Sequence, residues 1–315
     1  THSFEAVALE VFEYQKQNNP LYQEFINLLG LSNKNIQQIE DIPFLPIQFF
    51  KSKQIKTGQW TTSHVFSSSG TTQTTTSTHH LKSAEWYREN SCRFFEQQYG
   101  PLENYIVLAL LPSYLERKGS SLIFMIDAFI KNSKHPLSGF FLYNTQQLKE
   151  VLSLSAKENR NILLVGVSYA LLDLIQDYDL QLERLVVMET GGMKGRRKEM
   201  TKEQLHTTLK KGFKQTSIHS EYGMTELLSQ AYSKKDGIFT PCPTMQVYIR
   251  EINDPFCMAT LGKVGAVNVV DLLNIDTCSF VATDDLGRKY ESGNFSLHGR
   301  SDVSDLRGCN LLLLE

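Results

Sequence analysis

Three continuous apolar runs stand in the middle of the chain, at residues 105–111, 162–167 and 185–188. Short unbroken runs of this kind are typical of strands that are buried on both faces of a sheet. Helical patterns at 169–175 and 201–211 follow the second and third runs. Strands that alternate with helices predict parallel β-α-β units, in which ligands bind at the carboxyl ends of the strands.

The patterns on either side of this region are different. Apolar residues at helical spacing predict an amphipathic helix that starts near Phe4 and ends before Pro20, and a second helix over 21–29. Residues 41–50 are apolar but contain prolines, which exclude a regular helix or a central strand, so we expect an extended segment packed on the core. Beyond residue 245 the apolar runs are short and interrupted, which predicts an antiparallel or barrel-like β subdomain.

Residues 67–78 contain only Ser, Thr, Gly and Gln. Their hydroxyl groups can donate hydrogen bonds, and Gly70 leaves the backbone free to turn and to direct N–H groups at an anion. This composition indicates a phosphate-binding loop. A flexible Ser/Thr linker is the alternative that composition alone leaves open.

Composition and charge limit the classes of partner. The chain carries 32 basic and 34 acidic side chains, for a net charge of −2, so no basic excess indicates nucleic acid. No apolar run approaches the length of a membrane span and the N-terminus does not resemble a signal peptide, so we expect a cytoplasmic protein with a small partner. Five scattered cysteines without a C-x-x-C pair argue against a disulfide framework and against structural zinc.

Four short segments are informative when they are taken together: 68–72, 221–226, 283–287 and 299–302. In this order and at these separations they resemble the motifs of the adenylate-forming superfamily, which includes acyl-CoA synthetases, luciferases and peptide-synthetase adenylation domains. The resemblance runs from about residue 65 to the end of the chain. It implies an α/β fold with the N-terminal-domain architecture of these enzymes, in which parallel β-α-β sheets adjoin a smaller β-rich subdomain. It also implies ATP and Mg²⁺ as cofactors.

The resemblance assigns the Ser/Thr loop to the β- and γ-phosphates of ATP. The phosphate-binding positions would be Ser68, Ser69, Gly70, Thr71 and Thr72. The loop departs from the usual pattern, because Gln73 stands where glycine is common and no lysine follows soon after. We therefore expect its hold on pyrophosphate to be unusual.

Residues 222–226 are similar to the superfamily's aromatic-Gly-x-Thr-Glu motif. By this resemblance Tyr222 stacks on adenine, and Gly223 follows it in the motif. Thr225 hydrogen-bonds the α-phosphate, and Glu226 holds Mg²⁺ as a hard oxygen ligand. Without the other motifs, the same residues also suit a loop with a buried tyrosine and a glutamate at a helix start.

Further positions complete the implied nucleotide site. Gly191 and Gly192 resemble a glycine pair that lets the backbone approach adenine, although a simple turn after a strand predicts the same two residues. Asp285 resembles the aspartate that binds both ribose hydroxyls, with Asp284 as the competing position because the alignment can slip by one. Arg300 resembles an arginine that also contacts the ribose, and a surface Asp-Arg pair is the alternative.

Within the superfamily, the sequence looks most like the acyl-protein synthetase subunit of the bacterial bioluminescence fatty-acid reductase (LuxE-type). In that family a cysteine near the C-terminus accepts the acyl group, and Cys309 follows Arg307 and Gly308 here. An inert buried cysteine is the alternative. The mobile C-terminal domain of the superfamily is expected to be largely absent, and Lys194 is a candidate replacement for its lysine.

The resemblance therefore implies that the protein activates a carboxylic acid, fatty or aryl, with ATP and Mg²⁺ and passes the acyl group through Cys309 to a partner protein. Transfer to coenzyme A and a non-catalytic nucleotide-binding module are the alternatives. We expect a helical N-terminal segment packed on the core (1–64), an α/β nucleotide-binding core (65–245), a β-rich subdomain (246–298) and a hinge-like C-terminal segment that contains Cys309 (299–315).

Overall fold

The computed structural model describes residues 3–68, 76–112, 119–142, 144–191 and 200–300. One half of its main sheet is parallel, with neighbouring strands in the order β8 (His219–Tyr222), β7 (Leu185–Thr190), β6 (Asn161–Val167), β4 (Tyr105–Leu110) and β5 (Gly139–Phe141). The three apolar runs of the sequence are β4, β6 and β7, and each is almost entirely buried. The predicted parallel α/β arrangement is confirmed.

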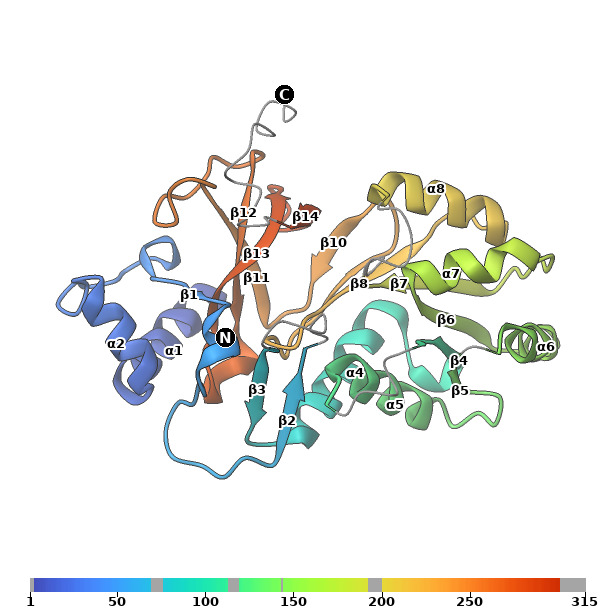
Figure 1. Cartoon of the computed structure of the whole chain (residues 1–315), viewed down its shortest axis with the longest axis horizontal. Helices are drawn as coiled ribbons and strands as arrows, with labels where there is room; N and C mark the ends of the chain where they lie inside the picture. Colours follow the sequence, from blue (N-terminus) through green and yellow to red (C-terminus); the bar gives the residue numbers. More distant parts are fainter. Residues whose placement is uncertain (1–2, 69–75, 113–118, 143, 192–199, 301–315) are drawn as a thin grey trace.

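Helices cover both faces of these parallel strands (Figure 1). α7 (Ser168–Leu174) and α8 (Lys202–Phe213) lie on one face, α4 (Ala84–Tyr99) and α5 (Ser121–Ser133) lie on the other, and α6 (Thr145–Ser155) lies at the outer edge. α8 begins with a capping box, in which the side chains of Thr201 and Gln204 each bond the backbone N–H of the other. The short 3₁₀ helices are η1 (Ile39–Asp41), η2 (Leu102–Asn104), η3 (Ile175–Asp177) and η4 (Leu272–Asp276).

The sheet continues from β8 into an antiparallel half. Its order is β9 (Ala231–Ser233), β10 (Ile238–Pro241), β14 (Phe295–Arg300), β13 (Phe280–Lys289), β12 (Val264–Asp271) and β11 (Met245–Arg250). The strands beyond residue 245 are antiparallel. This is one of the two arrangements, antiparallel or barrel-like, that the sequence predicts for this region. Because β14 pairs with β10, the two halves belong to one continuous sheet path. Tyr222, at the carboxyl end of β8, contacts Asp285 of β13 and Phe295 of β14.

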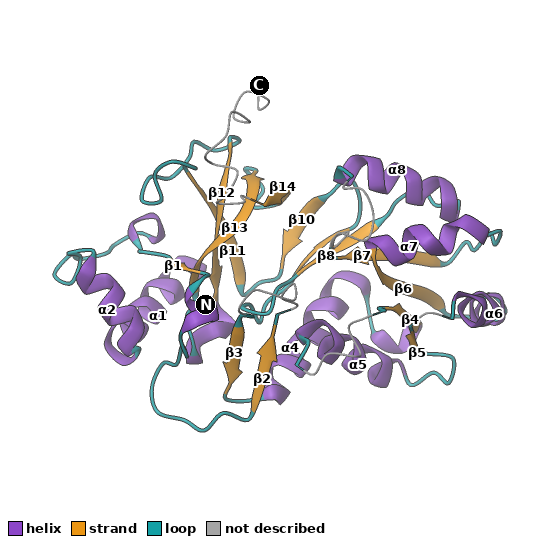
Figure 2. Ribbon diagram, in the orientation of Figure 1, coloured by secondary structure: helices purple, strands orange, loops and turns teal. Residues whose placement is uncertain are grey.

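The N-terminal helices α1 (Phe4–Asn18) and α2 (Pro20–Leu28) lie beside the antiparallel half (Figure 2). Asn19 caps α2 by accepting from the backbone N–H of Tyr22, and Pro20 occupies the first helical position. Residues 41–50 are less uniform than the extended segment that the prolines predict. Residues Leu45–Pro46 form β1, a parallel edge partner of β13, and Phe49 begins the short helix α3 (Phe49–Ser52).

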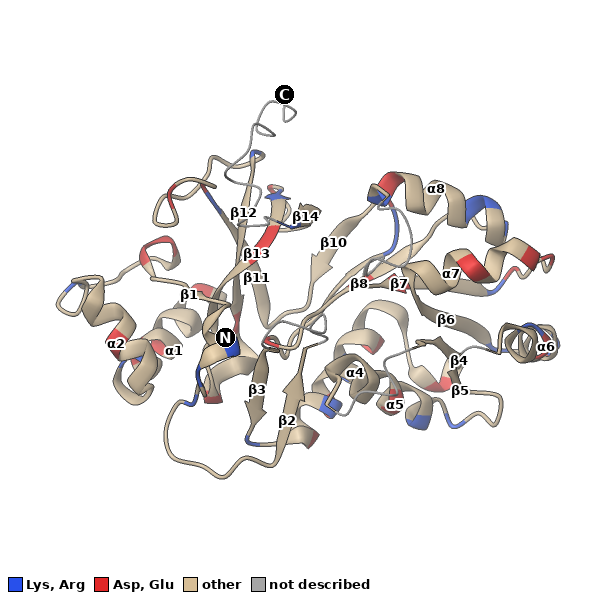
Figure 3. Cartoon of the chain, viewed as in Figure 1, with Lys and Arg blue, Asp and Glu red and all other residues tan. Residues whose placement is uncertain are grey.

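The ends of the Ser/Thr stretch also differ from a plain loop. Ser67 ends β2 (His64–Ser67) and Thr78 begins β3 (Thr78–Leu81), and these two strands pair antiparallel. Residues 68–77 are therefore the connection of a hairpin, of which 69–75 lie outside the described residues. Basic and acidic residues are interspersed along the ribbon (Figure 3). Among the described helices, none is long and apolar enough to cross a bilayer.

Candidate active site

Tyr222, Asp285 and Arg300 meet at the junction of the two halves of the sheet. The Tyr222 hydroxyl donates to Asp285 Oδ2 at 2.8 Å, and Arg300 Nε donates to Asp285 Oδ1 at 3.0 Å. Asp285 in β13 is the direct cross-strand partner of Arg300 in β14, so the register of these strands fixes the pair. Burial and the charge of Asp285 raise the pKa of Tyr222, which keeps its phenol protonated and donating.

Aromatic rings hold Tyr222 in this position. Its ring meets Phe239 and Phe295 edge-on, with centroids 6.0 and 5.6 Å away, and the two phenylalanines stack on each other. These rings come from β10 and β14, the two strands that join the sheet halves. The orientation of Tyr222 therefore depends on the pairing of β10 with β14, which joins the two halves of the sheet.

The two consecutive aspartates of β13 have different surroundings. Successive residues of a strand point to opposite faces, and Asp284 accepts from Gln48 Nε2 at 2.6 Å on the side away from Tyr222. Asp285 is only 7% exposed, whereas Asp284 is partly exposed. The carboxylate that lies beside Tyr222 and Arg300 is thus Asp285.

The turn that carries Thr225 and Glu226 is fixed by buried polar contacts. Asp271 accepts from the backbone N–H groups of Leu228 and Ser229, and Asn274 Nδ2 donates to the Glu226 carbonyl at 2.9 Å. His79 Nδ1 donates to the Thr225 carbonyl at 2.8 Å. Burial lowers the pKa of His79 to about 4, so this histidine is neutral and structural at pH 7.

Glu226 lies at the base of the Ser/Thr hairpin connection. Burial raises the pKa of Glu226, and a hydrogen bond from the Ser77 hydroxyl opposes that rise. Ser77 and Ser68 close the connection, since Ser68 N donates to Ser77 O and Ser77 N donates to Ser68 Oγ. A carboxylate with one serine partner suits Mg²⁺ when phosphate oxygens and water supply the remaining ligands. Ser69, Gly70, Thr71 and Thr72 lie outside the described residues.

Gly191 directly follows β7 and has a φ of +70°, a conformation that favours glycine over other residues. Ser168 Oγ donates to the Gly191 carbonyl at 3.1 Å and so ties this turn to the start of α7. Gly192, Lys194 and Cys309 lie outside the described residues. Gly223 lies close to the Glu221 side chain, because a Cβ at this position would be 2.4 Å from Glu221 Oε1 and would force that carboxyl group to shift.

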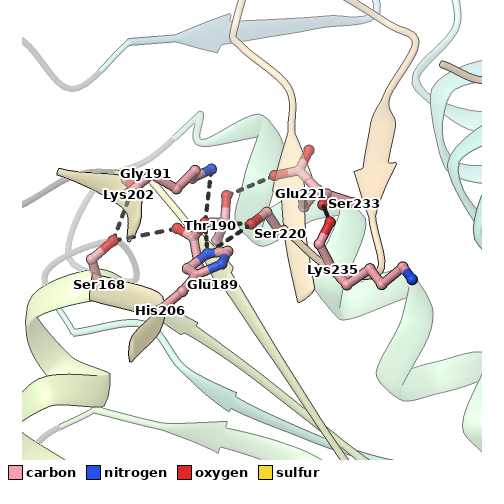
Figure 4. Close-up of polar contacts among 10 residues, drawn as sticks. All are labelled: Ser168, Glu189, Thr190, Gly191, Lys202, His206, Ser220, Glu221, Ser233 and Lys235. Atoms are coloured by element: carbon pink, nitrogen blue, oxygen red, sulfur yellow. Dashed lines mark hydrogen bonds and ion pairs between the residues drawn. The ribbon is translucent and has the colours of Figure 1, made fainter. Parts of the chain in front are cut away.

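A buried carboxylate cluster supports the ends of β7 and β8 (Figure 4). Glu189 accepts from Lys202 Nζ at 2.9 Å, from Ser220 Oγ at 2.5 Å and from His206 Nε2 at 3.3 Å. Burial alone would raise the pKa of Glu189, but the charge of Lys202 and these hydrogen bonds outweigh it and hold the pKa at about 2. Lys202 Nζ also lies 4.7 Å from the centre of the Phe239 ring, which contacts Tyr222.

Glu221, next to Tyr222 in β8, is a second buried carboxyl group. Its Oε2 accepts from Thr190 Oγ1 at 2.6 Å. Burial, and to a lesser degree the charge of Glu189, raise the pKa of Glu221 to about 7. The group therefore changes charge near neutral pH at the edge of the candidate site.

Sequence reasoning placed Tyr222, Asp285 and Arg300 in one site, and the structure brings these three side chains into contact. It gave no role to Glu189, Glu221 or Lys202. A carboxylate at the polar end of an otherwise apolar strand could have drawn attention to Glu189. The sequence holds no comparable signal for Lys202, because its partner Glu189 belongs to a different element, β7.

No protein-family model and no curated protein sequence matches this chain. Solved structures do match. An open conformation of 2-hydroxyisobutyryl-CoA ligase in complex with 2-HIB-AMP and CoA aligns with a TM-score of 0.68 and 13% identity over 95% of this chain and 74% of that one.

Two other similar structures align with lower TM-scores. ATP-bound MatB from Rhodopseudomonas palustris gives a TM-score of 0.57 at 14% identity, over 76% of this chain and 48% of MatB. The amide bond synthetase McbA from Marinactinospora thermotolerans gives 0.52 at 16% identity, over 76% and 49%. The chain thus spans about half the length of MatB and McbA. At these identities the likeness establishes the fold, and the predicted fold of adenylate-forming enzymes is confirmed.

Proposed function

We propose that this protein is an ATP-dependent ligase that activates a carboxylic acid as an acyl-adenylate. The observation that carries the proposal is the contact of Tyr222, Asp285 and Arg300 at a strand end, in a chain whose fold is that of adenylate-forming ligases. A tyrosine ring beside a buried, arginine-paired carboxylate matches the two parts of a nucleoside. The ring offers a face to a base, and the carboxylate accepts from two ribose hydroxyls.

Each site residue receives one role in this proposal. Tyr222 stacks on adenine beside Gly191 and Gly192, and Asp285 and Arg300 bind the ribose. Thr225 binds the α-phosphate, and Gly223 leaves room next to Glu221. The phosphate tail runs toward the Ser/Thr hairpin connection, because Ser77 at its base already contacts Glu226.

The chemistry follows from this placement. A carboxylate is a poor acyl donor, and attack of its oxygen on the α-phosphorus of ATP forms an acyl-adenylate and releases pyrophosphate. Mg²⁺ held at Glu226 would neutralise charge on the departing pyrophosphate. Hydroxyl and amide groups of residues 68–72 would donate hydrogen bonds to the same oxygens.

We propose Cys309 as the acyl acceptor, on the strength of the LuxE-type resemblance, with a partner protein as the next recipient. A thiolate attacks the acyl-adenylate, AMP leaves and a thioester forms. Transfer to coenzyme A is the second candidate, because a structure that covers 95% of this chain is a CoA ligase with CoA bound. The division of the chain into segments 1–64, 65–245, 246–298 and 299–315 is also part of this proposal.

Pyrophosphate exchange tests the proposal. Incubation with labelled pyrophosphate, ATP, Mg²⁺ and a panel of fatty and aryl acids should transfer label into ATP in the presence of at least one acid. Glu226→Gln should lower the exchange rate by about a hundredfold, which corresponds to loss of metal-assisted charge stabilisation of about 3 kcal/mol. Glu291→Gln, at an exposed turn, is the matched control and should leave the rate unchanged. No exchange with any acid would support a non-catalytic nucleotide-binding module instead.

The acceptor is tested separately from the first half-reaction. Cys309→Ser should retain exchange but lose a hydroxylamine-labile acyl mass on the peptide that contains residue 309. Acyl-CoA formation that persists at the wild-type rate in Cys309→Ser would assign the acceptor role to coenzyme A.

A further inference from the structure

A pocket of about 390 Å³ opens on the face of β13 opposite the candidate active site. Its apolar walls come from α2 and the turn after it, from residues 42–46 and from the turn at 255–258. They include Phe25, Leu29, Phe44, Phe256 and Met258, and Ala282 of β13 also lines the pocket. This volume lies in the usual range for small-molecule sites, about 300 to 1,000 Å³.

Hydrogen bonds to backbone groups hold the walls of this pocket in place without a ligand. The Tyr22 hydroxyl donates to the Pro43 carbonyl at 2.7 Å, and Ile47 N donates to the Ala282 carbonyl at 2.9 Å. The turn at 255–258 is anchored because Ala259 N donates to the Ile249 carbonyl in β11. A ligand would therefore enter a largely formed site and would order little of the chain.

Four of the charged side chains that line the pocket have protein partners, and the fifth, Glu40, is exposed to solvent. Asp284 accepts from Gln48, and Arg250 donates to the carbonyls of Val267 and Thr283. At the rim, Lys34 and Asp41 form an ion pair at 3.2 Å. A charged ligand would have to compete with these contacts, whereas an uncharged apolar molecule would leave them intact.

The mouth of the pocket exposes apolar surface that a ligand could cover. Phe256 lines the pocket and is nevertheless 60% exposed. Covering such a ring removes apolar area from water and stabilises the complex in proportion to that area.

We propose that this pocket binds an uncharged, largely apolar small molecule, and that its occupancy is coupled to the nucleotide site through β13. Asp284 lines the pocket, and the next residue, Asp285, binds Tyr222 and Arg300 on the other face of the same strand. A ligand that fixes β13 from one side changes the freedom of Asp285 on the other. The coupling, unlike the binding, rests on the proposed function.

Fluorescent probes test the binding. N-phenyl-1-naphthylamine, which is uncharged, should bind saturably at one site, and the sulfonate probe 1-anilinonaphthalene-8-sulfonate should bind at least about tenfold more weakly.

Phe256→Ala should raise the dissociation constant of the uncharged probe by about fivefold or more, and Leu31→Trp should reduce binding by filling the pocket. Leu261→Ala removes another exposed apolar side chain that does not line the pocket and is the control. Equal binding of both probes, or binding that neither pocket variant weakens, would overturn the assignment.

The coupling is measured as the affinity for ATP with and without saturating N-phenyl-1-naphthylamine. We expect a change of about threefold or more, matched by the same factor in the probe's affinity at saturating ATP, because such coupling is reciprocal. ATP binding that the probe leaves unchanged would overturn the coupling alone. No ATP binding at all would overturn the proposed function and the coupling together, while the probe titration would still decide the pocket.

Discussion

At the scale of single residues, the candidate site depends on which face of a strand each side chain occupies. Asp284 and Asp285 are chemically identical neighbours, yet one contacts Gln48 and the other contacts Tyr222 and Arg300. The sequence left both open as the ribose-binding carboxylate. The pairing register of β13 with β14 separates them, because it places Asp285 directly opposite Arg300.

This difference predicts the effect of two matched substitutions. Asp285→Asn should weaken ATP binding by about 2 kcal/mol, or roughly thirtyfold in Kd, because a neutral amide offers the ribose weaker hydrogen bonds than a carboxylate does. Asp284→Asn, on the other face, should change Kd by less than about threefold. Isothermal titration calorimetry measures both. Equal effects of the two substitutions would contradict the assignment of Asp285 to the nucleotide.

At the scale of elements, Glu189 joins the end of β7 to β8 and α8 (Figure 4). Its partners Ser220 and Lys202 come from β8 and α8, and the neighbouring Ser168 at the start of α7 holds the Gly191 carbonyl. The cluster therefore fixes two strand ends that the proposed adenine site uses. Its charge is compensated inside the protein, which is the condition under which a buried carboxylate stabilises a fold.

We expect Glu189→Gln to lower the free energy of unfolding at pH 7 by about 2 to 3 kcal/mol, since the amide loses the ionic contact with Lys202. The pKa of Glu189 lies at about 2 in the folded protein, below its ordinary value of 4.5. The stabilisation is thus present above about pH 4.5 and is lost as the pH falls toward 2.

Urea unfolding at several pH values measures this difference. The gap between wild type and Glu189→Gln should narrow as the pH falls from 5 to 3, while Glu203→Gln, exposed on α8, should match wild type at every pH. A gap that stays constant over this range would argue against a depressed pKa in the folded state.

At the scale of the whole molecule, the N-terminal helices are integrated into the antiparallel half of the sheet. Gln15 of α1 is fully buried, donates to the Asn274 and Ile275 carbonyls and accepts from Ser279 N. These contacts join residues more than 250 positions apart in the chain. A helix that the sequence predicts only as amphipathic therefore satisfies backbone groups near the start of β13.

Gln15→Ala should destabilise the whole protein by about 3 kcal/mol, because it leaves the buried Ser279 N–H without its acceptor and removes a donor from the Asn274 and Ile275 carbonyls. Differential scanning calorimetry should show one transition at lower temperature, as expected for a single cooperative unit. Glu10→Ala, exposed on the same helix, is the control. Two separate transitions in Gln15→Ala would show instead that α1 unfolds independently of the sheet.

The parallel half of the fold was predictable from the sequence alone, as was the grouping of Tyr222, Asp285 and Arg300. Continuous apolar runs such as those of β4 and β6 have few interpretations other than buried strands, because only such strands bury both faces. The motif around Tyr222 was readable for a similar reason, since its residues are adjacent in the chain. Short motifs and hydrophobic periodicity can be read directly from a sequence, because they involve residues close together in the chain.

Features that depend on partners far apart in the chain follow only from the three-dimensional structure. The hairpin pairing of β2 and β3, the joining of the two sheet halves through β10 and β14, and the partner of Lys202 all involve groups that no local pattern relates. The choice between Asp284 and Asp285 is of the same kind, because a shift of one residue in strand register exchanges the two faces. The charge of Glu189 is maintained by that same distant packing, since burial would neutralise a carboxylate that lacked Lys202 and Ser220.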